Sequence, residues 1–190
     1  MSKITFETKL FEINGWTIMH MPKEESEKFP SRGQVMVKGT INGFPFQTAF
    51  EPDGNWGHWL NVDKDMQKSA KVKAGDIVKM EVESTKDWPE PMVAKDIQDA
   101  VVDDPKIKPL WERITPLARW EWIRWINSTE NAETRKHRIE VSCSKLLKGE
   151  RRPCCFNRNM CCVPQVSKNG ILLDASGDKV GVGYGHQVSK

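Results

Sequence analysis

The N-terminal part of the chain alternates apolar and polar residues with a period of two, a pattern that predicts short β-strands. Between residues 34 and 50 this alternation runs on both sides of Asn42-Gly43, a dipeptide typical of a two-residue hairpin turn. The alternation that begins at Ile4 changes phase after Leu10, which predicts a β-bulge before the turn at Asn14-Gly15. We therefore expect a set of strands joined by tight turns.

Two later alternating segments complete this predicted set of strands. Residues 56–62 follow the turn Pro52-Asp53-Gly54, and residues 78–83 follow Gly75-Asp76. Five or six short strands with few long connections favour a small closed β-barrel, because closure removes exposed strand edges. We expect this barrel domain to occupy residues 1–86.

The hydrophobic period changes to that of helices after a linker that contains Pro89 and Pro91. Thr115-Pro116 and Asp104-Pro105 each predict a helix N-cap followed by proline at the first helical position. A last helix is expected from about residue 132, ended by a glycine at position 149. The residues predicted to form buried helical stripes are Ala118, Trp122, Trp125, Ile126, Ile139, Cys143, Leu146 and Leu147.

These patterns predict an α+β fold in three parts. The closed barrel is followed by a small helical domain over 87–150 and by a cysteine-rich extension over 151–190. No segment approaches the roughly 18 consecutive apolar residues of a membrane-spanning helix, and the N-terminus does not have the pattern of a signal peptide. We therefore expect a cytoplasmic protein without membrane insertion.

The charge balance excludes few classes of binding partner. The 190 residues include 29 Lys and Arg against 26 Asp and Glu, a formal net charge of +3. This small excess makes nucleic acid an unlikely partner. Much of the excess lies between residues 135 and 152, which leaves room for a local site for a small anionic ligand.

A cluster of cysteines is the most distinctive feature of the sequence. Four of the five cysteines form two adjacent pairs separated by five residues: Cys154, Cys155, Cys161 and Cys162. Thiolates are soft ligands suited to zinc, Cu(I) or iron, and the neighbouring arginines favour deprotonation of the thiols. The sequence therefore predicts a metal site formed by these four residues.

Four alternatives to a four-thiolate site remain open at this point. Adjacent cysteines tend to point apart, so a partial ligand set completed by His137, His186 or a second chain is the first. The others are a redox switch, buried thiols that serve as small hydrophobic packing groups, and disulfides that form only after cell lysis. Cys143 belongs to the predicted helical stripe and is not counted as a ligand.

Basic residues near the start of the last predicted helix are candidates for binding an anion. Arg135, His137 and Arg138 lie there, and helix N-termini and arginine forks both favour phosphate or carboxylate groups. The alternative is a solvated helix face with an ion pair to Glu130 or Glu133.

Tryptophans are unusually frequent, with eight in the chain. At helical spacing Trp111, Trp120, Trp122 and Trp125 are expected in the core, where their indole N–H groups need partners. This need makes a groove between barrel and helices a candidate pocket, with Trp122 as a contact.

Several short segments together resemble a known pair of domains. The first group resembles the small β-barrel domain of unknown function that precedes YdeI/OmpD-associated helical domains in bacterial proteins: Gly39–Phe46, Pro52–Gly54 and Ala74–Val78. The second group resembles that helical domain, also labelled bacteriocin-protection: Trp125-Ile126, Glu133–Ile139 and Leu146–Gly149. The resemblance covers residues 3–150, implies a barrel followed by helices, and carries over no catalytic residues.

No motif in the sequence favours an enzyme, because phosphate-binding glycine loops, nucleophile elbows and zinc-binding His-Glu-x-x-His helices are absent. His20 and His58 lie on expected strands and could line one barrel mouth with Asp53 or Asp63, but surface or rim positions are favoured. The leading hypothesis is a non-catalytic bacterial accessory protein that binds a soft metal or senses redox through its cysteines. The alternative is a small-molecule or nucleic-acid binding module that uses the groove. A third possibility is an enzyme that acts on a phosphorylated or carboxylated metabolite through Arg135 and His137, and the oligomeric state stays open.

Overall fold

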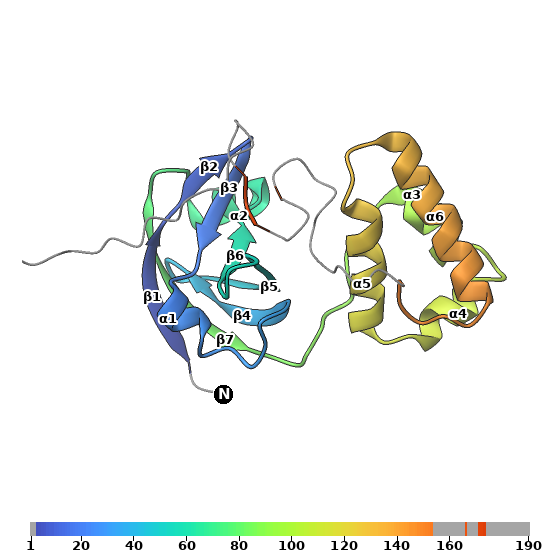
Figure 1. Ribbon diagram of the computed structural model, residues 1–190, viewed down its shortest axis with the longest axis horizontal. Helices are drawn as coiled ribbons and strands as arrows, with labels where there is room; N and C mark the ends of the chain where they lie inside the picture. The colour runs from blue at the N-terminus through green and yellow to red at the C-terminus, as the bar shows by residue number, and fades with distance from the viewer. Residues whose placement is uncertain (1–2, 154–165, 167–170, 174–190) are drawn as a thin grey trace, which may run out of the picture.

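The computed structural model describes residues 3–153, 166 and 171–173 of the chain. A strongly curled antiparallel sheet and a group of helices lie side by side, joined by the segment between β7 and α3 (Figure 1). The strands are β1 (Ile4–Lys9), β2 (Phe11–Ile13), β3 (Trp16–His20), β4 (Val35–Ile41), β5 (Phe44–Pro52), β6 (His58–Asn61) and β7 (Ile77–Ser84). This arrangement confirms a mixed α+β fold with strands first and helices second.

The helices divide between the two parts. The sheet carries two short helices, α1 (Lys23–Ser26) and α2 (Lys64–Ala70). The helical part contains α3 (Lys95–Ile97), a π-helical turn (Gln98–Val102), α4 (Lys108–Arg113), α5 (Pro116–Asn127) and α6 (Ala132–Leu147).

The predicted closed barrel of five or six strands is wrong for the described residues. Seven strands form one open sheet in the order β1-β7-β4-β5-β6-β3-β2, a half-barrel whose two edges are β1 and β2. The chain changes partners at Leu10, whose backbone exchanges hydrogen bonds with Gly75 and Asp76. As a result β1 pairs with β7 while β2 pairs with β3, and no ladder joins the two edges.

The hairpin predicted at residues 34–50 is confirmed. Strands β4 and β5 pair in register from Val35 opposite Phe50 to Ile41 opposite Phe44. Asn42 and Gly43 have φ angles of 47° and 84°, the left-handed pair that a type I′ turn requires. The core of the sheet lies inside the curl and includes Leu10, Val37, Phe50, Met80 and Val82.

The helix caps predicted in the helical part are confirmed with one exception. The Thr115 hydroxyl accepts a hydrogen bond from the Ala118 N–H at the start of α5, and Gly149 follows α6 with a φ of 81°. The Asp104 carboxylate accepts from backbone N–H groups in a turn before α4, so it does not cap that helix. Most of the predicted stripe residues are buried, Trp125 and Cys143 are partly buried against the same core, and Leu147, the last residue of α6, is 55% exposed.

The chain returns to the sheet after the helices. Val166 and Leu172 form an isolated antiparallel bridge and are both buried. They pack with Ile13, Ile18 and Trp59 in a small apolar cluster separate from the main core. This cluster covers the second face of β3 and β6, so both faces of these strands are buried.

Candidate ligand-binding groove between the sheet and the helices

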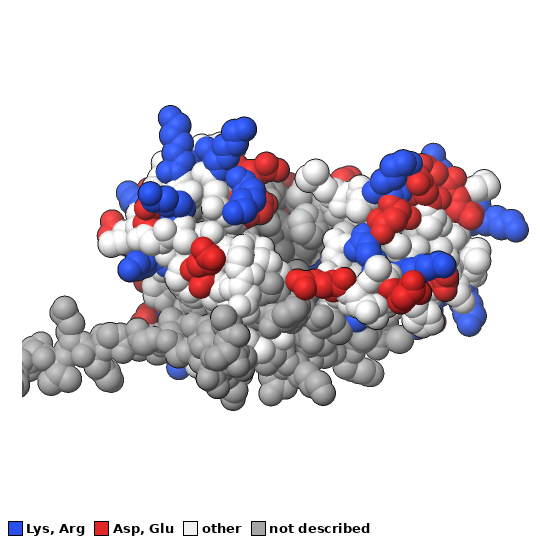
Figure 2. Space-filling view, turned by 90° about the horizontal axis from the view of Figure 1, so that it is seen from above, with Lys and Arg blue, Asp and Glu red and all other residues white. Residues whose placement is uncertain are grey.

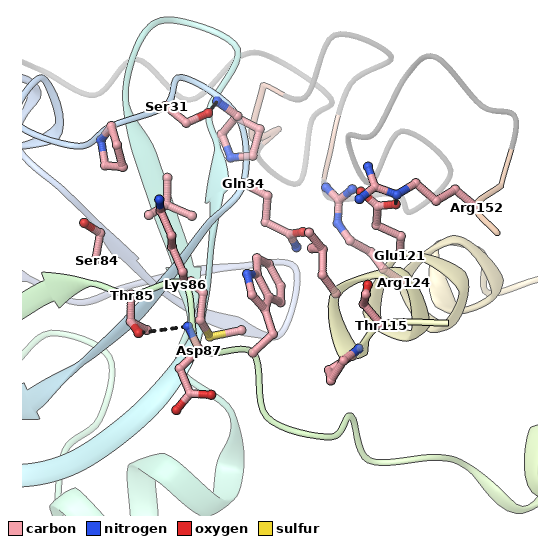
Figure 3. A pocket seen from close by; sticks show the side chains of 18 residues that line it. Ser31, Gln34, Ser84, Thr85, Lys86, Asp87, Thr115, Glu121, Arg124 and Arg152 are labelled. Atoms are coloured by element: carbon pink, nitrogen blue, oxygen red, sulfur yellow. Dashed lines mark hydrogen bonds and ion pairs between the residues drawn. The ribbon is translucent and has the colours of Figure 1, made fainter. Parts of the chain in front are cut away.

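A groove of about 860 Å³ lies between the sheet and the start of α5. Three segments line most of it: residues 30–36 before and within β4, residues 84–88 at and after the end of β7, and residues 115–124 at and within α5. Figure 3 shows Gln34, Thr85 and Lys86 on the sheet side, facing Glu121, Arg124 and Arg152 on the helical side. The volume falls within the range of about 300–1,000 Å³ that is usual for small-molecule sites.

A buried ion pair links the two sides of the groove. The Arg124 Nε donates to Glu51 Oε1 at 2.9 Å, and its Nη2 donates to Oε2. Both side chains are almost buried, with 11% and 10% of their surfaces exposed. Gln34 adds a hydrogen bond from its amide to Glu51 Oε1 at 2.8 Å. The Arg124 charge is therefore neutralised inside the protein.

A second, more open ion pair lies on the helical side. The Arg152 Nε is 3.2 Å from Glu121 Oε2, and the Arg152 side chain is 46% exposed. Lys86 is exposed on the sheet side, next to the exposed Asp87. With Arg124 neutralised by Glu51, Arg152 and Lys86 are the lining cations most open to a ligand.

The remaining lining is apolar with a few hydroxyl groups. Trp88 packs edge to face against Trp120, with ring centroids 5.9 Å apart, and the Trp120 indole donates to the Pro89 carbonyl. Leu117 extends this apolar surface from α5. An apolar wall beside separate cations is suited to a small organic molecule with a charged end.

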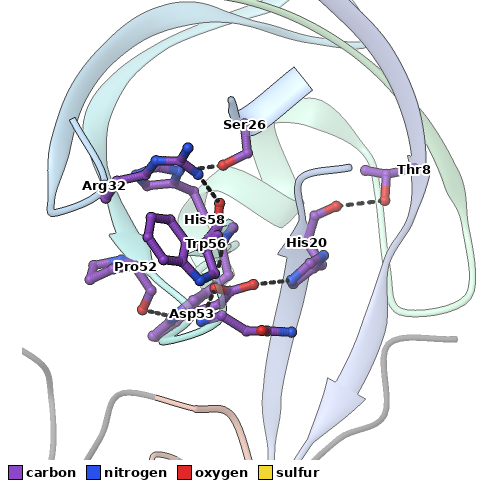
Figure 4. Close-up of polar contacts among 11 residues, drawn as sticks. Thr8, His20, Ser26, Arg32, Pro52, Asp53, Trp56 and His58 are labelled. Atoms are coloured by element: carbon purple, nitrogen blue, oxygen red, sulfur yellow. Dashed lines mark hydrogen bonds and ion pairs between the residues drawn. The ribbon is translucent and has the colours of Figure 1, made fainter. Parts of the chain in front are cut away.

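A buried polar cluster lies beneath the loop at residues 52–57, which contributes Pro52 to the groove. The His20 Nε2 and the Asp53 Oδ2 are 3.0 Å apart, and Asp53 Oδ1 accepts hydrogen bonds from the N–H groups of Asn55 and Gly57 (Figure 4). Burial opposes ionisation of Asp53, but the hydrogen bonds from His20 and the two backbone groups outweigh it and lower the Asp53 pKa. The carboxylate thus fixes the loop from inside.

His58 fixes the neighbouring loop in the same way. Its Nε2 lies 2.8 Å from the Gly33 carbonyl, to which it donates, so its Nδ1 accepts from the Ser26 hydroxyl at 2.6 Å. Burial lowers the His58 pKa and favours this neutral form. Ser26 and His58 are 1% and 0% exposed, so their contact positions the loop and is closed to a substrate.

The surface or rim positions favoured for His20 and His58 are therefore wrong. Both side chains are buried, because β3 and β6 are covered on both faces. Of the two aspartates considered as neighbours of these histidines, Asp53 contacts His20. Asp63 instead caps α2, where its side chain accepts a hydrogen bond from the Met66 N–H. Sequence reasoning missed Glu51 and Arg124 altogether.

The basic residues predicted to bind an anion in α6 contact protein groups. The Arg135 Nε and Nη2 bind the two Asp96 oxygens at 2.6 and 3.0 Å. Arg138 donates to the Trp125 carbonyl and to the Ser128 hydroxyl. His137 is exposed on α6. The arginines thus connect elements of the helical part, and the ion-pair partner of Arg135 is Asp96, whereas the alternative to an anion site named Glu130 or Glu133.

Trp122 lies in the helical core and not in the groove. Its side chain is fully buried, and its indole donates to the Arg151 carbonyl at 3.1 Å. The four predicted ligand contacts, Arg135, His137, Arg138 and Trp122, are all absent from the groove lining.

The predicted metal ligands Cys154, Cys155, Cys161 and Cys162 lie outside the described residues. Within the described part, no group of three or more His, Cys, Asp or Glu side chains is arranged to hold a metal ion. Cys143 packs against the helical core, and burial raises the pKa of its thiol. The metal hypothesis therefore stays a prediction from sequence.

Comparison with known families identifies both parts of the chain. Residues 6–82 match a domain of unknown function, DUF1905, and residues 90–149 match the family described as bacteriocin-protection, YdeI or OmpD-associated. The chain therefore contains one segment similar to each of these two families. No curated protein matches it significantly. Among the described residues, no helix is long and apolar enough to cross a membrane.

The groove lies at the junction of the two family segments. Ser84 to Trp88, which line its sheet side, fall between the matched ranges, while Gln34 belongs to the first range and Arg124 to the second. The groove therefore combines residues of both matched segments with residues of the segment that joins them.

Proposed function

We propose that the protein is a non-catalytic binding protein for a small organic anion, which it holds in the groove between the sheet and the helices. The observation that carries this proposal is Arg152, a half-exposed arginine in the groove lining whose Nε lies 3.2 Å from Glu121 Oε2. Arginine presents five donors in a planar fork, so a carboxylate or phosphate group can bind its outer nitrogens while Glu121 keeps the Nε. The anion would then lie over the apolar wall formed by Trp88 and Leu117.

The composition of the lining supports binding rather than turnover. The lining residues of the groove include neither histidine nor cysteine. The Ser26–His58 contact, which resembles an activated serine, is buried beneath the loop. General acid–base chemistry needs a titratable group within hydrogen-bond reach of the substrate. The lining carboxylates are those of the exposed Asp87 and of Glu121, which is paired with Arg152, and the rest of the groove supplies shape, hydroxyls and cations.

The distribution of charge supports a small ligand over a nucleic acid. On the face shown in Figure 2, basic and acidic side chains are interspersed over both parts. A nucleic-acid surface would instead require a continuous basic patch that releases counterions from many phosphates. A single cation in a groove, by contrast, needs only one anionic group on its ligand.

The experiment is a binding screen that uses a matched pair of arginine variants. Aliphatic carboxylates, aromatic carboxylates and phosphate monoesters are titrated against the protein, with tryptophan fluorescence as the readout because Trp88 lies in the wall. Arg152→Ala is expected to weaken binding about 10- to 100-fold, the range for losing a charged hydrogen bond. Arg151→Ala is the control, since Arg151 is exposed and does not line the groove. Equal loss in both variants, or none in either, would contradict the proposal.

A further inference from the structure

Lys86 is a cation of the groove lining that has no acidic partner among the described residues. It lies in the segment that follows β7, on the sheet side of the groove, and it is exposed. In the part of the chain that the structure describes, no carboxylate lies within ion-pair distance of its ammonium group. The other two cations of the lining, Arg124 and Arg152, are each paired with a glutamate. Lys86 is therefore the lining cation that is most open to an anion.

Hydrogen bonds fix the backbone on both sides of Lys86. The Thr85 N–H donates to the Met36 carbonyl of β4 at 2.9 Å, and the Asp87 carbonyl accepts from the Gln47 side chain of β5 at 2.7 Å. The Asp87 N–H also donates to the Thr85 hydroxyl at 3.0 Å. The sheet thus sets the position of the Lys86 backbone, while the ammonium group at the end of the side chain is left without a partner.

The neighbouring carboxylate of Asp87 acts on a different lysine. Figure 3 shows the side chains of Lys86 and Asp87 extending in opposite directions. The pKa of Lys38 in β4 is raised by its hydrogen bond to Glu83 and by the charge of that residue, and to a smaller extent by the charge of Asp87. Asp87 therefore contributes to a group of charges on β4 and β7 and leaves Lys86 unpaired.

Arg152 lies on the opposite side of the groove from Lys86 (Figure 3). Apolar surface connects the two sides, because Trp88 follows Lys86 by two residues and packs against Trp120 of α5. Leu117 adds to this surface from the first turn of α5. The groove thus presents one accessible cation on each side of an apolar surface.

We infer that the ligand of the groove is a dianion, with two anionic groups joined by a short apolar portion. One group binds the outer nitrogens of Arg152, the other binds the ammonium group of Lys86, and the apolar portion lies on Trp88 and Leu117. This inference rests on the proposed function, because it names the chemical class of the ligand of the same groove. Once one end is bound, the second contact forms within the complex, so it adds affinity at a lower entropic cost.

The test compares probes that carry one or two anionic groups on chains of equal length. Linear dicarboxylates from succinate to suberate are titrated by calorimetry against the full chain, each beside the monocarboxylate with the same number of carbons. Alkanediol bisphosphates and alkyl phosphates form a second series, because a lysine ammonium group binds carboxylate and phosphate alike. In at least one series the wild type is expected to bind a dianion about tenfold or more tightly than its monoanion.

Lys86→Gln is the decisive variant. It is expected to remove the preference for the dianion and to leave the affinity for the monoanion close to that of the wild type, whereas Arg152→Ala is expected to weaken both. Lys38→Gln is the control, since Lys38 is also exposed on the sheet but is paired with Glu83 and does not line the groove. A preference that survives in Lys86→Gln, or one that is lost equally in Lys38→Gln, would overturn the inference.

Thermal unfolding separates a binding role of Lys86 from a structural one. Because the side chain is exposed and has no carboxylate partner among the described residues, Lys86→Gln is expected to melt at the temperature of the wild type. A clearly lower melting temperature, together with weaker binding of monoanions and dianions alike, would assign Lys86 a structural role and overturn the inference.

The two proposals fail in different ways. Equal binding of monoanions and dianions to the wild type, with both weakened by Arg152→Ala, overturns the second anionic group and leaves the proposed function standing. Failure of the wild type to bind any of these probes overturns the inference as well, while the wider screen of carboxylates and phosphates still decides the proposed function.

Discussion

The guanidinium of Arg124 binds both carboxylate oxygens of Glu51, and this ion pair joins α5 to β5. The two residues are 73 positions apart in the chain, and each side chain is about one-tenth exposed. Charges removed from water in this way depend on each other, because an unpaired buried charge is strongly unfavourable. The pair thereby fixes how the helices sit beside the sheet and how wide the groove is.

Breaking this pair is expected to destabilise the protein severely. Arg124→Ala leaves the Glu51 carboxylate buried without its cation, a change that typically costs about 3–5 kcal/mol. The double variant Glu51→Gln with Arg124→Met, measured by urea denaturation, is expected to cost less than the sum of the two single changes. Strict additivity would show that the two side chains do not depend on each other.

Arg135→Ala is the matched comparison for Arg124→Ala. Arg135 also forms a two-point ion pair, but its partner Asp96 is 46% exposed. Exposed pairs contribute at most about 1 kcal/mol, so this variant is expected to unfold close to the wild type. A loss as large as that of Arg124→Ala would refute the assignment of interdomain stability to the Glu51 pair.

Stability is expected to fall as the solution becomes acidic, starting near neutrality. Burial keeps the His58 pKa in the folded protein below its ordinary value of 6.5. Below that pH the unfolded chain takes up a proton that the folded protein does not, so the free energy of unfolding decreases. Asp53, whose pKa is lowered from 3.8, adds a further loss only in stronger acid.

His58→Gln tests this origin of the pH dependence. Glutamine can donate to the Gly33 carbonyl but does not titrate, so the variant is expected to be less stable at pH 7 and less sensitive to pH between 7 and 5. Urea denaturation at several pH values measures both quantities. An unchanged slope would assign the acid sensitivity to other groups.

The close approach of β4 and β7 predicts that one glycine is essential. A Cβ on Gly39 would lie 2.1 Å from the Glu81 carbonyl oxygen of the paired strand. Gly39→Ala is therefore expected to destabilise the sheet by about 1–3 kcal/mol or more, as overpacking does. Gly33→Ala is the control, since its Cβ would meet only the Ser31 hydroxyl at 3.5 Å. Similar melting temperatures for the two variants would contradict the register of β4 and β7.

The cysteine cluster predicts a metal that co-purifies with the protein. Elemental analysis of protein purified without oxygen and without an affinity tag is expected to give about one zinc, copper or iron per chain. Replacement of Cys154 and Cys162 by serine is expected to remove it, whereas Cys143→Ser, in the helical core, is expected to retain it. Metal content that survives the double replacement would exclude these residues as ligands.

The local features of the fold are predictable from the sequence because their causes are local. The period of two along β4 and β5, the Asn42-Gly43 turn and the Thr115 cap each depend on a few neighbouring residues. The openness of the sheet depends instead on how the chain bends at Leu10, where distant backbone groups of Gly75 and Asp76 compete for its hydrogen bonds.

The groove was predictable only in its location. Its ion pair joins positions 51 and 124, a separation at which a single sequence carries no signal for pairing. His20 and His58 were misplaced because the alternation argument assumes one exposed face, whereas β3 and β6 are covered on both. Trp122 was expected to contact a ligand because a tryptophan side chain is suited to a groove as well as to a core. In the structure its indole N–H donates to the Arg151 carbonyl inside the core.

Nuclear magnetic resonance of the tryptophan indole N–H groups tests the central proposal most directly. Trp88 lies in the groove, whereas Trp111 and Trp122 are buried in the helical core. Titration with the tightest-binding carboxylate of the screen is expected to shift the Trp88 signal in wild type and to leave the other two unmoved, and the same shift in Arg152→Ala is expected to need about 10- to 100-fold more ligand. Shifts confined to Trp111 and Trp122, or a Trp88 shift at the same ligand concentrations in Arg152→Ala as in wild type, would contradict binding of an organic anion at this groove.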